Sequence, residues 1–111
     1  AIARSLLANA EILLMDEPFG ALDIKTRIQM QDLLLELWNK FSSTILFVTH
    51  DIREAVYLGD DIYFMKYAPS RIVEHIKVDL PFHRNQDTRR LSRYNELIYE
   101  VEDAMFKIAA L

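Results

Sequence analysis

A run of four apolar residues that ends in two carboxylates constrains this chain more than any other feature. The run spans 12–15, and Asp16 and Glu17 follow it directly. It shows no alternation of polar and apolar residues, a pattern typical of a strand covered on both faces in a parallel sheet. Ligands of open α/β sheets bind beyond the carboxyl ends of the strands. The two acidic side chains are therefore expected at a ligand-binding edge.

A second buried strand is predicted at 44–48, because β-branched and aromatic residues dominate the segment TILFV. It ends in the polar pair Thr49 and His50. If the two strands are neighbours, Asp16, Glu17 and His50 meet at one edge of the sheet. One carboxylate can hold a hard cation such as Mg²⁺, and the other can orient and deprotonate a water molecule. With an imidazole that donates to a phosphoryl group, this is the set that phosphoryl transfer needs.

Helices are predicted between and after these strands. Asp23 can cap a helix that runs to about Phe41. The buried stripe expected on this helix comprises Ile24, Ile28, Leu34, Leu35, Trp38 and Phe41. A short helix is expected at 51–58, with Asp51 as its cap and Gly59 at its end.

The last part of the chain predicts two more strands, at 62–65 and 71–78, with a turn at 68–70 between them. In the second of these, Ile72, Glu74, Ile76 and Val78 are expected on one face. A polar linker follows at 80–87. The amphipathic helix expected at 88–111 carries the apolar stripe Leu91, Tyr94, Leu97, Ile98, Val101, Met105 and Ile108. Strands that alternate with helices over short loops predict the α/β class with parallel strands.

The chain opens with AIARSLLAN, without an initiator Met or a capping residue. This segment predicts a helix that is already under way over 1–8. We therefore expect the sequence to be a fragment of a longer protein.

Composition argues against several classes of protein. The formal net charge is -4, and acidic residues surround the small basic cluster of Arg89, Arg90 and Arg93, so no nucleic-acid-binding surface is expected. There is no cysteine, and no apolar run approaches the about 20 residues that span a bilayer. His75 and His83 have no partner at metal-ligand spacing and are expected at the surface.

The order of these motifs resembles that of the ABC transporter ATPases. Their Walker B strand is similar to ILLMDEP at 12–18, their D-loop to GALD at 20–23, and their H-switch to VTHD at 48–51. The helix after their LSGGQ signature resembles AIARSLLAN. The C-terminal part of subunits that import nitrate, aliphatic sulfonates or taurine is similar to SRIVEHIKVDLPFHR.

The resemblance implies the C-terminal part of a nucleotide-binding domain over 1–111. The Walker B, D-loop and H-switch region would occupy 1–66, and a C-terminal strand and helix 67–111. The fold would be a partial P-loop NTPase core with parallel strands, a C-terminal β-strand segment and a long C-terminal helix. Ser70 departs from the family's habit of a glycine at the turn before RIV.

The resemblance also implies roles for four residues, with ATP and Mg²⁺ as cofactors. Asp16 would hold Mg²⁺ through water, and Glu17 would be the general base or water-orienting carboxylate. His50 would contact the γ-phosphate. Asp23 and its loop would reach across a dimer interface and couple two sites.

The sequence contains no G-x-x-x-x-G-K-[ST] loop, and its only glycines are Gly20 and Gly59. The LSGGQ signature is absent too. The chain alone is therefore expected neither to bind ATP tightly nor to hydrolyse it. The resemblance implies a membrane permease subunit and a second ATPase subunit as partners, with a solute-binding protein acting indirectly, at the cytoplasmic face of the cell membrane. Strand edges and apolar surface left open would favour self-association.

Two other interpretations stay open from the residues. The chain could derive from a non-transport ABC ATPase that acts on DNA or ribosomes. It could also be a structural half-domain that dimerises and has no activity of its own.

Overall fold

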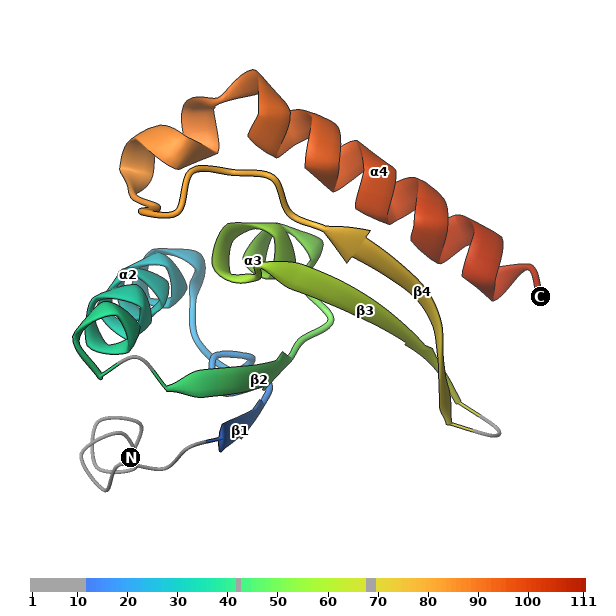
Figure 1. Cartoon of the computed structure of the whole chain (residues 1–111), viewed down its shortest axis with the longest axis horizontal. Helices are drawn as coiled ribbons and strands as arrows, with labels where there is room; N and C mark the ends of the chain where they lie inside the picture. The colour runs from blue at the N-terminus through green and yellow to red at the C-terminus, as the bar shows by residue number, and fades with distance from the viewer. Residues whose placement is uncertain (1–11, 42, 68–69) are drawn as a thin grey trace. The chain divides into compact units, whose positions relative to one another are not determined.

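The computed structural model describes residues 12–41, 43–67 and 70–111, which fall into two compact units that divide after residue 50. The first unit contains β1 (Ile12–Asp16), α2 (Ile24–Phe41) and β2 (Thr44–Val48). The second unit contains α3 (Ile52–Leu58), β3 (Asp61–Lys66), β4 (Arg71–Lys77), the short 3₁₀ helix η1 (Gln86–Arg90) and α4 (Ser92–Ala109) (Figure 1). The helix predicted over 1–8 and the turn residues at 68–69 lie outside the described residues.

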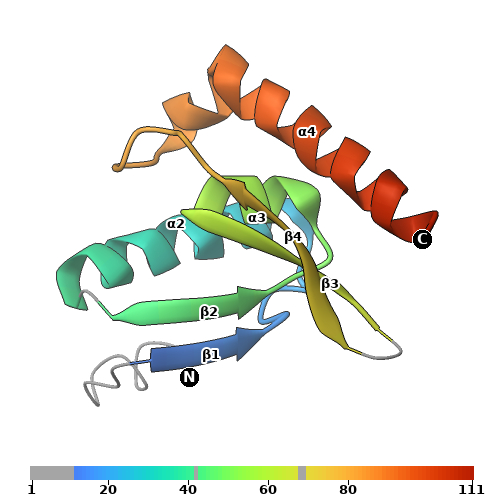
Figure 2. The ribbon, with the colours of Figure 1, turned by 45° about the vertical axis from the view of Figure 1, so that its right-hand side comes forward.

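In the first unit, β1 and β2 form a parallel pair, with Asp16 opposite Val48 at the carboxyl end. This pairing confirms the predicted parallel arrangement of the first two strands. Both views show α2 along one side of the pair (Figures 1 and 2). Met15 is buried, whereas Leu14, which points to the opposite face, is 65% exposed. The prediction that β1 is covered on both faces is therefore wrong within the described part of the chain.

The helix α2 begins where its cap was predicted, because the Thr26 amide donates to Oδ1 of Asp23 at 2.7 Å. Leu34, in the middle of the predicted stripe, is buried. The prediction of burial is wrong for Ile24, which is 81% exposed. Ile24 is the first helical residue, and side chains of a helix lean toward its N-terminus, so this one extends past the helix end. Gln31 is buried although the sequence pattern did not select it.

In the second unit, β3 pairs with β4 in an antiparallel hairpin, so the parallel arrangement holds only for β1 and β2 among the described strands. A β-bulge interrupts the hairpin at Val73. Glu74 lies opposite Phe64, but the next pair is Ile72 with Met65. The extra residue reverses the alternation of faces, so Ile72 is exposed and not on the face predicted for it.

The hairpin also gives His75 partners that the sequence did not indicate. His75 lies opposite Tyr63, and the two rings stack with centroids 4.5 Å apart. Nε2 of His75 lies 2.9 Å from Oδ1 of Asp61. His75 is exposed, as predicted, but it belongs to a cross-strand cluster that only the register of the hairpin creates.

The last helix, α4, begins at Ser92, four residues later than predicted. Thr88 instead belongs to η1, where its hydroxyl accepts the Asn85 amide in a capping box. The core of the predicted stripe is buried, namely Tyr94, Leu97, Ile98 and Val101. Since α4 contacts α3, its stripe packs within its own unit. No helix among the described residues is long and apolar enough to cross a membrane.

The C-terminal end of α3 is held by Arg84, which lies in the segment predicted as a polar linker. The Arg84 side chain is only 4% exposed. Its Nη1 donates to the carbonyl oxygens of Tyr57, Leu58 and Gly59, at 3.4, 3.3 and 2.8 Å. A cation at this position also complements the negative end of the helix dipole. Burial lowers the pKa of Arg84, while the nearby carboxylate of Asp60 opposes that shift.

Gly59 ends α3 as predicted, but for a different reason. Its φ of -80° is not left-handed, so glycine is not required at this residue for a left-handed helix cap. A Cβ at this position would lie 2.8 Å from the carbonyl oxygen of Ala55, closer than such atoms approach. Glycine is needed here for close approach of the backbone.

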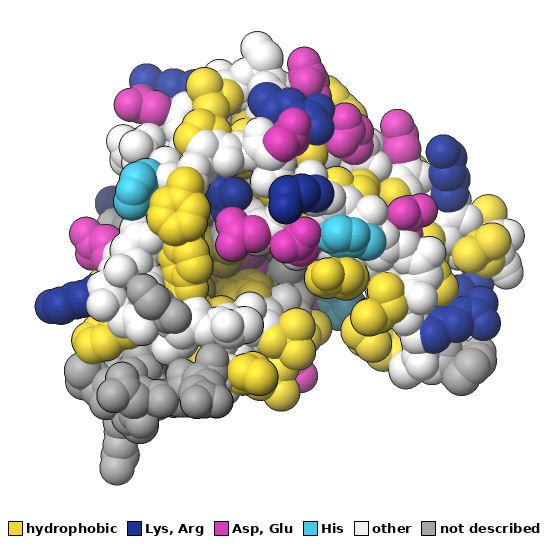
Figure 3. All heavy atoms as spheres, in the orientation of Figure 1, with side chains coloured by type: hydrophobic (Ala, Val, Ile, Leu, Met, Phe, Trp, Pro, Cys, Tyr) yellow, Lys and Arg dark blue, Asp and Glu magenta, His cyan; other side chains and the backbone are white. Residues whose placement is uncertain are grey.

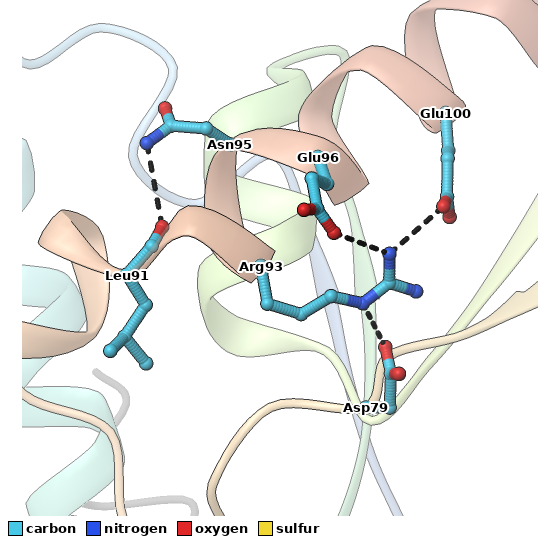
Figure 4. A network of polar contacts seen from close by, with 6 residues as sticks. All are labelled: Asp79, Leu91, Arg93, Asn95, Glu96 and Glu100. Carbon is cyan, nitrogen blue, oxygen red and sulfur yellow. Dashed lines mark hydrogen bonds and ion pairs between the residues drawn. The ribbon is translucent and has the colours of Figure 1, made fainter.

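Arg93 fastens the start of α4 to the segment after β4 (Figure 4). Its guanidinium contacts three carboxylates, namely those of Asp79 at 2.8 Å, Glu100 at 2.9 Å and Glu96 at 3.3 Å. The hydrogen bond from Arg93 lowers the pKa of Asp79. Asp79 lies outside α4, so the ion pair between Arg93 and Asp79 joins two segments of the chain. The ion pairs of Arg93 with Glu96 and Glu100 lie within α4.

We expect Arg84→Met to lower the free energy of unfolding by about 2 kcal/mol, because carbonyls at the end of α3 lose a charged donor in a buried setting. Urea unfolding followed by far-UV circular dichroism measures this. The matched control is Arg90→Met, which removes the same charge from an exposed position. Its effect should stay within about 0.5 kcal/mol. Equal effects of the two substitutions would contradict the role given to Arg84.

Candidate functional site

The candidate site lies at the carboxyl end of the parallel pair. The amide of Glu17 donates to the carbonyl oxygen of Val48 at 2.8 Å, which extends the β1–β2 ladder by one residue. Nε2 of His50 lies 3.1 Å from Oε1 of Glu17. The side chains of His50 and Glu17 are 80% and 41% exposed. The structure thus brings these two predicted site residues together at an accessible edge of the sheet.

Asp16 does not join that contact. It is the exposed last residue of β1, and successive side chains of a strand point to opposite faces. Among the described residues, no group of three or more acidic or histidine side chains converges as a metal site. A single exposed carboxylate nevertheless fits Mg²⁺, which keeps several waters and is commonly bound by one or two carboxylates together with phosphate oxygens.

Glu17 has a backbone conformation that sequence reasoning missed. Its φ is 46°, in the left-handed region that residues other than glycine rarely adopt. Such a conformation costs on the order of 1 kcal/mol or more and persists only where the surroundings hold it. Two hydrogen bonds do so, from the Glu17 amide to Val48 and from the Gly20 amide to the Glu17 carbonyl oxygen at 3.2 Å. The only sequence signal was the turn-forming pair Pro18 and Gly20.

The loop between β1 and α2 is anchored at its centre by Phe19. This side chain is buried, and its ring lies 5.8 Å from that of Phe47 on β2. The Leu22 amide donates to the carbonyl oxygen of Phe19 at 3.1 Å. Nη2 of Arg27 lies 3.2 Å from the carbonyl oxygen of Gly20 and 3.5 Å from that of Leu22. Arg27 was not selected from the sequence, where it is one of several charged residues on a helix.

Asp23 closes this loop and begins α2. Hydrogen bonds from the Thr26 hydroxyl and then the Thr26 amide lower the pKa of Asp23 below its ordinary value. The carboxylate is exposed, so it is both a helix cap and an accessible anion at the end of the loop.

Comparison with known proteins adds to this geometry. No protein-family model matches the chain. A Brucella melitensis protein named for ATP binding is 52% identical over 89 residues, which are 80% of this chain and 38% of that protein. The aliphatic sulfonates import ATP-binding protein SsuB of Bacillus subtilis is 49% identical over 88 residues, 79% of this chain and 34% of SsuB. The taurine import ATP-binding protein TauB of Pseudomonas savastanoi is 51% identical over 78 residues, 70% of this chain and 30% of TauB.

This level of identity confirms the resemblance to ABC transporter ATP-binding subunits. The parallel strand pair, with Glu17 and His50 just beyond its carboxyl end, agrees with it. Within that class, the chain is homologous to the import ATP-binding proteins whose members include SsuB and TauB. It spans between 30% and 38% of the length of these three relatives.

Asp23→Ala should speed hydrogen exchange of the Thr26 amide, because that amide loses its acceptor, whereas Asp23→Asn should retain much of the protection. The pKa of Asp23 is lowered in the folded chain, so the stabilisation by the charged cap is present above the ordinary value of 3.8. This stabilisation is lost as the pH falls through the lower pKa that Asp23 has in the folded chain. Exchange measured by NMR across this range tests both statements.

Glu36→Ala is the control, because it removes the same charge from an exposed position later in α2. It should leave Thr26 exchange unchanged. The same exchange rate for Thr26 in the Asp23→Ala and unsubstituted chains would show that the cap contributes nothing.

Proposed function

We propose that this chain supplies the hydrolytic half of the ATP site in the ATP-binding subunit of an ABC importer. The observation that carries the proposal is the contact between Glu17 and His50 at the carboxyl ends of two parallel strands. SsuB and TauB, which are 49% and 51% identical to this chain over the matched residues, support the same assignment. The motif region 1–66 and the C-terminal segment 67–111 would then be successive parts of one nucleotide-binding domain.

Glu17 is proposed as the carboxylate that orients the attacking water and accepts its proton. Its Oε1 contacts His50, and its second oxygen can accept a hydrogen bond from that water. Asp16 is proposed to hold Mg²⁺, which supplies neutralisation of charge on the phosphate oxygens when it is bound. Asp23 and the loop before it are proposed to reach a second copy of the subunit and couple two sites.

His50 is proposed to donate a hydrogen bond to the transferring phosphoryl group. A donor hydrogen at Nε2 suits this task, and the same atom contacts Glu17. Phosphoryl oxygens and the Glu17 carboxylate would therefore compete for one donor. His50 would turn from the carboxylate toward the phosphate as the site fills, which leaves Glu17 available to the water.

The proposed substrates of transport are small anions such as nitrate, sulfonates or taurine. Similarity to SsuB, an aliphatic sulfonates import protein, and to TauB, a taurine import protein, supports the last two. The proposed partners are a membrane permease subunit and a second ATPase subunit, with a solute-binding protein acting indirectly, at the cytoplasmic face of the membrane. Phosphate-holding residues would have to come from outside these 111 residues, since the sequence has no glycine-rich phosphate loop.

Self-association of the chain is part of the proposal. Hydrophobic side chains reach the surface at several places on the face drawn in Figure 3. In the first unit, the exposed ones on a single face of the parallel pair are Ile12, Leu14 and Leu46. Apolar side chains gathered on one sheet face favour burial against another surface.

The 111-residue chain alone should neither hydrolyse ATP nor bind it with micromolar affinity, because it lacks the loop that cradles the phosphates. Isothermal titration with Mg-ATP and a phosphate-release assay measure this. A micromolar dissociation constant for the chain by itself would contradict the division of the site into two halves.

In the complete ATP-binding subunit that carries this sequence, Glu17→Gln should reduce ATP turnover by about 10²- to 10⁴-fold while ATP binding is kept. The amide retains the size of the side chain but cannot take a proton. Steady-state phosphate release and nucleotide binding are measured on the same preparation, with Glu36→Gln as the control for loss of a charge. Undiminished turnover in the Glu17 variant would remove that residue from the mechanism.

A further inference from the structure

We propose that Arg27 is a positioning residue that holds the loop after β1 so that the Glu17 carboxylate stays beside His50. This inference rests on the function proposed for Glu17, but its structural part stands on geometry alone. All of the groups involved lie in the first unit of the chain.

Arg27 is the fourth residue of α2, at the end of its first turn, and its side chain points back to the loop that precedes the helix. Its Nη2 lies 3.2 Å from the carbonyl oxygen of Gly20 and 3.5 Å from that of Leu22. The Arg27 backbone is fixed by a hydrogen bond from its amide to the carbonyl oxygen of Asp23 at 2.9 Å. A guanidinium is planar and permanently charged, so one group can hold two carbonyls in a defined geometry. We call this contact of Arg27 with Gly20 and Leu22 the Arg27 clamp.

The clamp reaches Glu17 through a single residue. Gly20, whose carbonyl oxygen faces Arg27, donates its amide to the carbonyl oxygen of Glu17 at 3.2 Å. That hydrogen bond is one of the two that keep Glu17 at a φ of 46°. The side chain of Glu17 contacts His50, with Oε1 of Glu17 lying 3.1 Å from Nε2 of His50. A chain of contacts therefore runs from Arg27 through Gly20 and Glu17 to His50.

The strain at Glu17 explains why such a clamp is needed. A left-handed glutamate relaxes to a right-handed or extended backbone unless neighbouring contacts prevent it. Relaxation would rotate the side chain away from its present direction and separate it from His50. Phe19 anchors the centre of the loop in the core. Its burial does not by itself prevent rotation of the peptide group that carries the Gly20 carbonyl. Arg27 holds that part of the loop, because its guanidinium donates to the carbonyl oxygens of Gly20 and Leu22.

The test uses three substitutions in the 111-residue chain. Arg27→Met keeps an apolar stem of similar length and removes the donors. Arg27→Lys keeps one charged donor and should restore part of the effect. Lys25→Met is the matched control, because it removes the same charge from an exposed position in the first turn of α2.

Hydrogen exchange of individual amides, measured by NMR, is the readout. In Arg27→Met, the amides of Gly20 and Glu17 should exchange roughly tenfold faster relative to the amides of β1 and β2. The carbon chemical shifts of Glu17 should move away from left-handed values. Arg27→Lys should lie between Arg27→Met and the unsubstituted chain, and Lys25→Met should match the latter.

Two results would overturn the proposal. One is exchange of Gly20 and Glu17 in Arg27→Met within about twofold of the unsubstituted chain, since a charged hydrogen bond is worth more than that. If Arg27→Met instead unfolds the first unit, seen as fast exchange throughout β1 and β2, Arg27→Lys decides the matter. Exchange of Gly20 and Glu17 in the lysine variant that rises no more than that of β1 and β2 would then be the second, because it would show only a general effect of Arg27 on stability.

The activity measurement separates this inference from the proposed function. In the complete subunit, Arg27→Met should lower kcat for ATP hydrolysis about tenfold with KM for ATP nearly unchanged, and Arg27→Lys should recover part of kcat. A merely structural role would lower the amount of folded protein and leave kcat per folded site unchanged. If Glu17→Gln retains full turnover, the proposed function fails, while the exchange results for the Arg27 clamp keep their meaning.

Discussion

The hydrogen bond from the Glu17 amide to the Val48 carbonyl oxygen is the contact on which the site depends. It continues the parallel ladder beyond β1, and it places the residues that follow the two strands side by side at the carboxyl end of the pair. A shift of register by one residue would send every side chain of a strand to the opposite face. The meeting of Glu17 with His50 is therefore a consequence of strand pairing, which apolar residues drive, and not of attraction between two exposed side chains.

Local features of the sequence predicted most of the secondary structure correctly because they act over a few residues. The apolar runs gave β1 and β2, and Asp23 and Asp51 both cap the helices that follow them. The parallel pairing then followed from the helix between the strands, and with it the proximity of Glu17 and His50. Such features are reliable when side chain and backbone preferences agree within one element.

The features that escaped prediction depend on residues distant in sequence or on a reversal of a local preference. Arg84 looked like part of a polar linker, but it is buried at the end of a helix about 25 residues earlier in the chain. The bulge at Val73 reverses the faces of β4, which no count of alternating residues reveals. The left-handed backbone of Glu17 opposes the preference of glutamate itself. The roles proposed for Asp16 and Asp23 stay predictions, because they involve Mg²⁺, nucleotide and a second subunit, which the geometry of these 111 residues does not include.

The backbone of Glu17 also has a consequence for how this position changes during evolution. Glycine and asparagine adopt a φ of 46° more readily than glutamate does, so either would relieve strain in the fold. Under the proposed function, selection for stability and selection for a carboxylate therefore act in opposite directions at residue 17. If the proposed role of Glu17 in hydrolysis is no longer selected for, drift toward glycine or asparagine is not opposed by folding. A lineage could lose the carboxylate there while it keeps, or even improves, the stability of the domain.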